Sequence, residues 1–68
     1  MTVTLAVRNS PTMEVTLEWE RPGFCARVYE KWGGEWHQTH ESRRYSDKRS
    51  AARSYSYFVR KYFKEREE

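Results

Sequence analysis

One cysteine and two histidines are the residues of this chain best suited to chemistry, and their spacing argues against a catalytic site. Cys25 with His37 or His40 would supply a nucleophile and a base. The strand pattern predicts that Cys25 and His40 point to opposite faces of a sheet, and no third orienting residue or oxyanion-hole motif accompanies them. His37 and His40, three residues apart in a strand, are expected to face opposite ways and not to share a metal ion. We therefore expect a non-enzymatic protein without metal or cofactor.

Three carboxylates form the second chemical candidate. Glu14, Glu18 and Glu20 alternate with apolar residues, so they are expected to share one face of a strand. Such a row suits acid and base chemistry or a divalent metal. Arg27 and Lys31, in the next strand-like segment, are better partners, because cross-strand opposite charges contribute about 0.2–1 kcal/mol per pair. The pattern favours structural ion pairs.

Positive charge is concentrated near the end of the chain. The 68 residues carry a net charge of +3, yet residues 1–42 hold more acidic than basic side chains, and residues 43–68 hold nine basic and four acidic ones. Charge of one sign without acidic partners at i+4 favours binding to a polyanion or an acidic protein surface over a merely solvated face. The candidate binding residues of this segment are Arg43, Arg44, Lys48, Arg49, Arg53, Arg60 and Lys64.

A predicted hairpin supplies the remaining candidates. Trp32 lies at its tip, either as a peg packed against the helix end or as an anchor for a partner, since Trp is enriched in binding hot spots. Arg27, Lys31 and His37 from the same hairpin are candidates for contacts in a nucleic-acid groove.

Alternating residues predict the first two strands. Residues 2–7 place Val3, Leu5 and Val7 on one side, and residues 13–20 alternate more regularly still. Few charges interrupt the first of these strands, so it is a candidate edge strand for a homodimer.

Gly33-Gly34 predicts a hairpin with two candidate registers. A two-residue loop pairs Lys31 with Trp36, whereas a three-residue loop pairs Glu30 with Trp36. We favour the three-residue loop, because it places Phe24, Ala26 and Val28 on the same face as Trp36, Gln38 and His40.

A helical pattern begins after Tyr45. Ser46 is the expected N-cap with Asp47 in the first turn, and the helix could extend to Arg66. Its apolar stripe consists of Ala51, Ala52, Tyr55, Phe58, Val59 and Tyr62.

These elements predict an α+β fold, an antiparallel three- to four-stranded meander packed on one C-terminal helix in the order β-β-β-β-α. Its length fits a single domain, residues 1–68, and one cysteine excludes an intramolecular disulfide. The lack of disulfides, of a targeting segment and of a long apolar run predicts a cytoplasmic protein without membrane contact.

Residues 18–62 resemble a family of DNA-binding domains in three features: a central strand over residues 23–29, the Gly33-Gly34 hairpin, and the aromatic, hydroxyl and alanine pattern of residues 45–51. The family comprises the arm-type N-terminal domains of phage and transposon tyrosine integrases. The resemblance implies a three-stranded sheet with a C-terminal helix, whose exposed sheet face enters the DNA groove. It would assign that role to Arg27, Tyr29, Lys31, His37 and Thr39.

The residues themselves favour the helix as the binding surface, because the glutamates expected on the sheet face would repel phosphates. The leading hypothesis is a DNA-binding module that grips phosphates with the basic helix and the preceding loop. The alternative is a protein-binding inhibitor or adaptor of the phage type, docking on an acidic or nucleic-acid-binding surface of a host complex. Neither hypothesis involves a small-molecule substrate.

Overall fold

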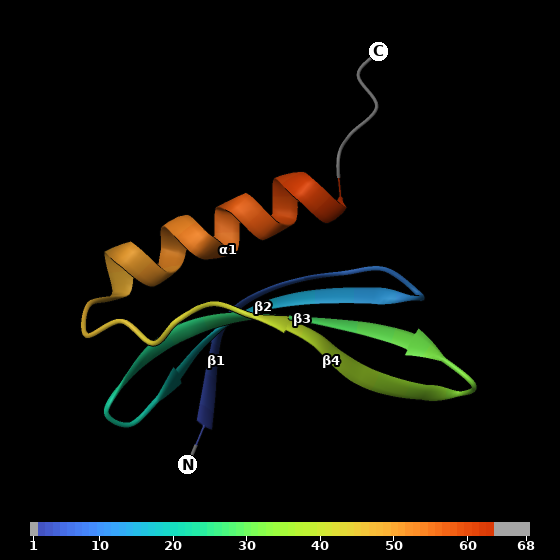
Figure 1. Ribbon diagram of the computed structural model, residues 1–68, viewed down its shortest axis with the longest axis horizontal. Helices are drawn as coiled ribbons and strands as arrows, with labels where there is room; N and C mark the ends of the chain where they lie inside the picture. The colour runs from blue at the N-terminus through green and yellow to red at the C-terminus, as the bar shows by residue number, and fades with distance from the viewer. Residues whose placement is uncertain (1, 64–68) are drawn as a thin grey trace.

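A computed structural model describes residues 2–63 as one antiparallel sheet and one helix (Figure 1). The strands follow one another as a meander in the order β1-β2-β3-β4. The α+β class and the element order are those predicted. The elements are β1 (Thr2–Asn9), β2 (Met13–Glu20), β3 (Gly23–Trp32), β4 (Glu35–Glu41) and α1 (Lys48–Tyr62).

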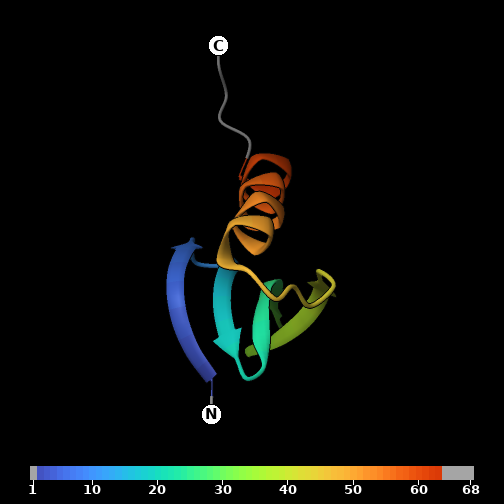
Figure 2. The same ribbon diagram turned by 90° about the vertical axis from the view of Figure 1, so that its left-hand side faces the viewer.

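The helix covers one face of the two central strands. Figure 2 shows α1 above β2 and β3, with β1 and β4 at the two edges of the sheet. The alternation predicted for β2 places its apolar residues opposite those of β3, on the side of the helix. The buried residues between helix and sheet are Val15, Leu17, Ala26, Val28 and Ala51. No helix within residues 2–63 is long and apolar enough to span a membrane.

The prediction that the apolar residues of β1 share one face was wrong, because the strand contains a β-bulge. Register shifts between Thr4 and Ala6, so Val3 lies opposite Trp19 whereas Val7 lies opposite Thr16, on the other face. The extra residue, Leu5, interrupts the period of two that the alternation assumed. Among residues 2–63, β1 and β4 form the two edges of the sheet, and the expected homodimer through β1 stays a prediction.

The hairpin between β3 and β4 uses the register that the sequence argument disfavoured. Gly33 and Gly34 have φ of 65° and 80°, which suits a two-residue turn, and Lys31 lies opposite Trp36. Trp36 consequently points away from the helix and remains exposed. A shift at Thr39 then brings His40 opposite Val28, on the helix side. The preference for burying Trp36 was therefore wrong, because a bulge realigns the strand further along.

The helix begins one residue later than predicted. Asp47, not Ser46, is the N-cap, and its side chain accepts a hydrogen bond from the backbone N–H of Ser50 at 2.8 Å. The described helix ends at Tyr62, so the suggested extension to Arg66 falls outside the described residues.

The segment from β4 to α1 is tied to the first residues of β3. The backbones of Phe24 and Tyr45 exchange two hydrogen bonds of 2.7 and 2.8 Å. Gly23 lies against this segment, and a Cβ atom there would come within 2.5 Å of the Tyr45 carbonyl oxygen. Its φ is not positive, so Gly23 is needed for space and not for an unusual backbone conformation.

Replacing Gly23 by alanine should therefore weaken the junction between sheet and helix. We expect a loss of about 1–3 kcal/mol in the free energy of unfolding, measured by urea denaturation, because backbone atoms must move apart. Gly33→Asn is the control: nothing lies within 4 Å of its Cβ position, and Asn tolerates a positive φ. Equal stabilities for the two variants would contradict this account.

Candidate nucleic-acid interface

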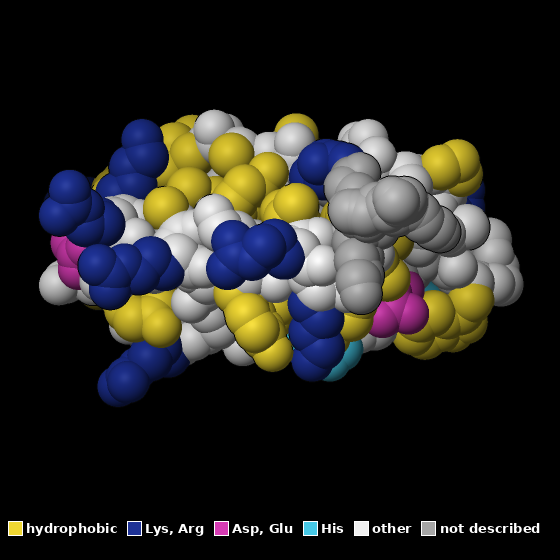
Figure 3. Space-filling view, turned by 90° about the horizontal axis from the view of Figure 1, so that it is seen from above, with side chains coloured by type: hydrophobic (Ala, Val, Ile, Leu, Met, Phe, Trp, Pro, Cys, Tyr) yellow, Lys and Arg dark blue, Asp and Glu magenta, His cyan; other side chains and the backbone are white. Residues whose placement is uncertain are grey.

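The outer side of α1 carries a row of arginines. Arg49, Arg53 and Arg60 recur at spacings of four and seven residues, which places them on one side of a helix, and all three are exposed. Within residues 2–63 none of them takes part in an ion pair. Figure 3 looks down on this face and shows basic side chains along the helix, gathered toward its N-terminal end, with acidic ones only at the margins. We call these three residues the arginine stripe.

The arginine stripe is long enough to follow a nucleic-acid backbone. Arg60 follows Arg49 by eleven positions along the helix, a rise of about 16 Å at 1.5 Å per residue. That length corresponds to about five nucleotides of one strand at 3.4 Å each. Ser56 lies between the arginines and, with Ala52, completes a shallow hollow of about 440 Å³.

Asp47 is the acidic residue at the start of this helix, and its carboxylate serves as the cap. The hydrogen bond from the Ser50 N–H, chiefly, lowers the pKa of Asp47, with a smaller effect from the charge of Arg53. The described helix itself, Lys48–Tyr62, contains no acidic side chain. The positive charge of the arginine stripe is thus left largely uncompensated.

A cleft opens beside the arginine stripe, between α1 and the segment that precedes it. Its volume is about 460 Å³. Arg43 stands on the segment side, where its guanidinium lies 6.0 Å from the centre of the Tyr45 ring, and Arg53 stands on the helix side. The cleft is lined by Ser42, Arg43, Tyr45, Ser50, Arg53, Ser54, Tyr57 and Phe58.

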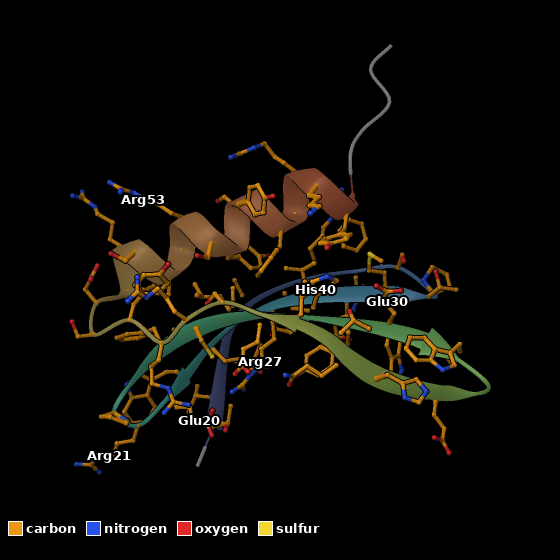
Figure 4. All side chains as sticks on the ribbon, viewed as in Figure 1. Glu20, Arg21, Arg27, Glu30, His40 and Arg53 are labelled. Atoms are coloured by element: carbon orange, nitrogen blue, oxygen red, sulfur yellow. The ribbon has the colours of Figure 1, made fainter. Side chains whose placement is uncertain are left out.

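The sheet face away from the helix is acidic and centred on Arg27. Figure 4 shows Arg27 and Glu20 on this side, opposite to Arg53 on the helix. The Arg27 guanidinium binds Glu18, Glu20 at 2.8 Å and Glu41 at 2.8 Å, and its side chain is only 13% exposed. Burial alone would lower the pKa of Arg27, but the hydrogen bonds to Glu20 and Glu41 outweigh it and raise the pKa. The charge of Arg27 is therefore compensated by carboxylates of the protein itself and is not available to a ligand.

Glu18 is the buried member of this cluster. Its Oε2 accepts a hydrogen bond from the Thr16 hydroxyl at 2.8 Å and one from the Tyr29 hydroxyl at 3.4 Å. Cys25, opposite Glu18 on β3, is buried as well, and burial raises the pKa of its thiol. A buried thiol of raised pKa is a poor nucleophile.

The two histidines share a face, against expectation. The bulge at Thr39 places both His37 and His40 on the helix side, opposite Glu30 and Val28. The His40 ring lies 5.3 Å from that of Tyr62, and Tyr62 and His40 Nε2 are hydrogen-bonded at 3.1 Å. Within residues 2–63 no group of three or more His, Cys, Asp or Glu is placed to hold a metal ion.

The hairpin candidates are dispersed over two faces. His37 stacks on Trp32 with ring centres 3.9 Å apart, whereas Lys31 lies over Trp36 on the opposite side. Trp32 stays 52% exposed at the hairpin tip. The single sheet face that the integrase resemblance implied for Arg27, Tyr29, Lys31, His37 and Thr39 is not formed.

The structure brings together part of the predicted basic set. Arg43, Lys48 and the arginine stripe are exposed on or beside the helix. Arg44 instead forms an ion pair with Glu20, with 3.4 Å between Arg44 Nη2 and Glu20 Oε1. Lys64 lies outside the described residues. Tyr57, which is exposed and lines the cleft, was not among the candidates predicted from the sequence. Its absence from the apolar stripe and its place one turn after Arg53 were the available signals.

Comparison with known proteins adds no assignment, because no family model, curated protein or solved structure matches this chain.

The Arg27 cluster should be required for stability. Arg27→Gln removes the charge that compensates buried Glu18, so we expect a loss of about 3 kcal/mol or more in the free energy of unfolding. Lys31→Gln is the matched control on the same strand, since Lys31 forms no ion pair within the described residues. Urea denaturation measures both. If Arg27→Gln were as stable as Lys31→Gln, the cluster would be dispensable.

Stability should also fall in acid through Glu20. Its hydrogen bond with Arg27 lowers the pKa of Glu20 below the ordinary 4.5. A lowered pKa contributes stability that is fully present above the unfolded value and is lost as pH falls through the folded one. The unfolding free energy should therefore decrease below pH 4.5, and Glu20→Gln should decrease less steeply.

The control for this pH series is Glu35→Gln, because Glu35 is exposed and forms no ion pair within residues 2–63. It should follow the unmodified protein at each pH. Identical pH profiles for Glu20→Gln and the unmodified protein would refute the contribution of Glu20.

Proposed function

We propose that this protein is a nucleic-acid-binding module that contacts DNA phosphates through α1 and the segment before it. The observation that carries the proposal is the exposed arginine stripe, Arg49, Arg53 and Arg60, which has no ion-pair partner within residues 2–63. Arg43 and Lys48 extend the same positive surface. Such a surface binds phosphates without reading sequence and releases counterions on binding.

The charge distribution favours approach from the helix side. Glutamates of β2 and β4 occupy the opposite face around Arg27, where a phosphate backbone would be repelled. The likeness to integrase arm-type domains points to the same ligand through the sheet face. The compensated charge of Arg27 is the reason to prefer the helix.

An acidic protein surface is the second candidate partner. Trp32 and Trp36 are both strongly exposed near the hairpin tip, and exposed tryptophan is typical of protein-binding hot spots. An inhibitor or adaptor would combine these side chains with the basic surface. Such a protein would not need to bind free nucleic acid, so the measurement below separates the two candidates.

Binding to a generic DNA duplex should be measurable at low salt by fluorescence anisotropy and should weaken steeply as salt increases. Three arginine contacts predict a slope of about −3 in a plot of log K against log salt. Arg49→Gln and Arg60→Gln should each reduce the steepness by about one. These values follow from one phosphate contact per arginine.

Arg21→Gln is the control for this titration, because Arg21 is exposed in the β2–β3 turn on the side away from the helix (Figure 4). It should leave affinity and slope unchanged. Absence of binding at low salt, or equal effects of Arg21→Gln and Arg49→Gln, would overturn the proposal.

A further inference from the structure

The cleft beside α1 is open to solvent, and its volume and lining suit the binding of a ligand at the surface. Its volume of about 460 Å³ lies within the usual range for small-molecule pockets, roughly 300–1,000 Å³. Arg43 and Arg53 face it from two different segments, and its lining contains serine hydroxyls and aromatic rings but no acidic side chain. An anionic ligand with a flat apolar part matches this combination.

The flat part of the ligand would meet Tyr57. This side chain is 52% exposed, although it lies on the helix that closes the core. Its ring is steadied by Phe58, with ring centres 5.8 Å apart, and Lys61 Nζ lies 5.7 Å from its centre. Tyr57 follows Arg53 by four residues, so the ring and the guanidinium are neighbours on the helix surface.

The anionic part would lie between the arginines. The Arg43 guanidinium is positioned over the Tyr45 ring, and the Tyr45 hydroxyl contacts the Ser54 hydroxyl at 3.3 Å. The segment that carries Arg43 is held by Ser42, whose Oγ accepts a hydrogen bond from the Ala26 N–H at 3.0 Å. The backbone of the segment wall is therefore tied to the sheet before a ligand arrives, which reduces the entropy lost on binding.

We propose that this cleft binds one unpaired nucleotide of a single-stranded nucleic acid, with its phosphate between Arg43 and Arg53 and its base stacked on Tyr57. The inference rests on the proposed function and specifies its ligand. Bases in a duplex are stacked on one another and do not present their faces, whereas an unpaired base does. Phosphates reach the arginine stripe from either form, so the cleft is what confers a preference for single strands.

Three probes of equal length, on the order of 15 nucleotides, test this preference by fluorescence anisotropy. They are an oligothymidylate, a single strand of abasic sites with the same phosphates, and a duplex. The unmodified protein should bind the oligothymidylate about ten-fold more tightly than the abasic strand, since stacking is lost with the base. Tyr57→Ala should remove that difference and leave duplex affinity unchanged, whereas Tyr57→Phe should retain it.

Arg49→Gln is the matched control, because Arg49 belongs to the arginine stripe but does not line the cleft. This substitution should weaken binding to the oligothymidylate and binding to the abasic strand by the same factor. Circular dichroism melting of Tyr57→Ala reports whether the variant is folded. If it is not, the comparison of the oligothymidylate with the abasic strand on the unmodified protein still tests the inference.

The outcomes separate this inference from the proposed function. If the oligothymidylate and the abasic strand bind equally well to the unmodified protein, the cleft does not hold a base, although phosphate binding by the helix survives. A stronger affinity for the duplex than for the oligothymidylate also overturns the inference. If none of the three probes binds at low salt, both proposals fail.

Discussion

The guanidinium group of Arg27 connects strands β2, β3 and β4. From β3 it binds Glu18 and Glu20 on β2 and Glu41 on β4, so one cation compensates carboxylates on both neighbouring strands. Glu18 is buried, and an unpaired charge there would cost several kcal/mol. The thiol of Cys25 lies beside this cluster, enclosed on the same face. Because Arg27 compensates these carboxylates, one face of the sheet can be acidic although the net charge of the protein is positive.

The same interaction separates the charges of the molecule. The exposed basic side chains of α1 and the segment before it lie on one side of the molecule, while Glu18, Glu20 and Glu41 surround Arg27 on the opposite face of the sheet. Opposite faces of different sign orient a charged partner during approach. The proposed binding by the arginine stripe and by the neighbouring cleft depends on this division, since carboxylates beside the arginines would compete with phosphates.

The overall architecture could be predicted from periodicity, but the positions of individual side chains in the edge strands could not. A period of two in β2 and a helical period after Tyr45 are local patterns, and both are present in the structure. Bulges in β1 and at Thr39 in β4 each insert one residue and reverse the faces beyond it. Val7 lies on the unexpected face because of the bulge in β1, whereas Trp36 and His37 do so because the hairpin has a two-residue turn. No local sequence pattern indicates where a bulge will form, because a bulge arises when one strand pairs with another.

The sequence by itself determined the elements, their order and the concentration of positive charge near the C-terminus, since each follows from composition or from the spacing of neighbours along the chain. The tertiary structure decided which charges remain free. Arg27 and Arg44 meet glutamates from other strands, whereas Arg49, Arg53 and Arg60 form no ion pair within residues 2–63. It also assembled the cleft from Arg43, Arg53 and Tyr57. Charge compensation and cleft formation depend on distances between segments far apart in the chain, which spacing along the sequence does not encode.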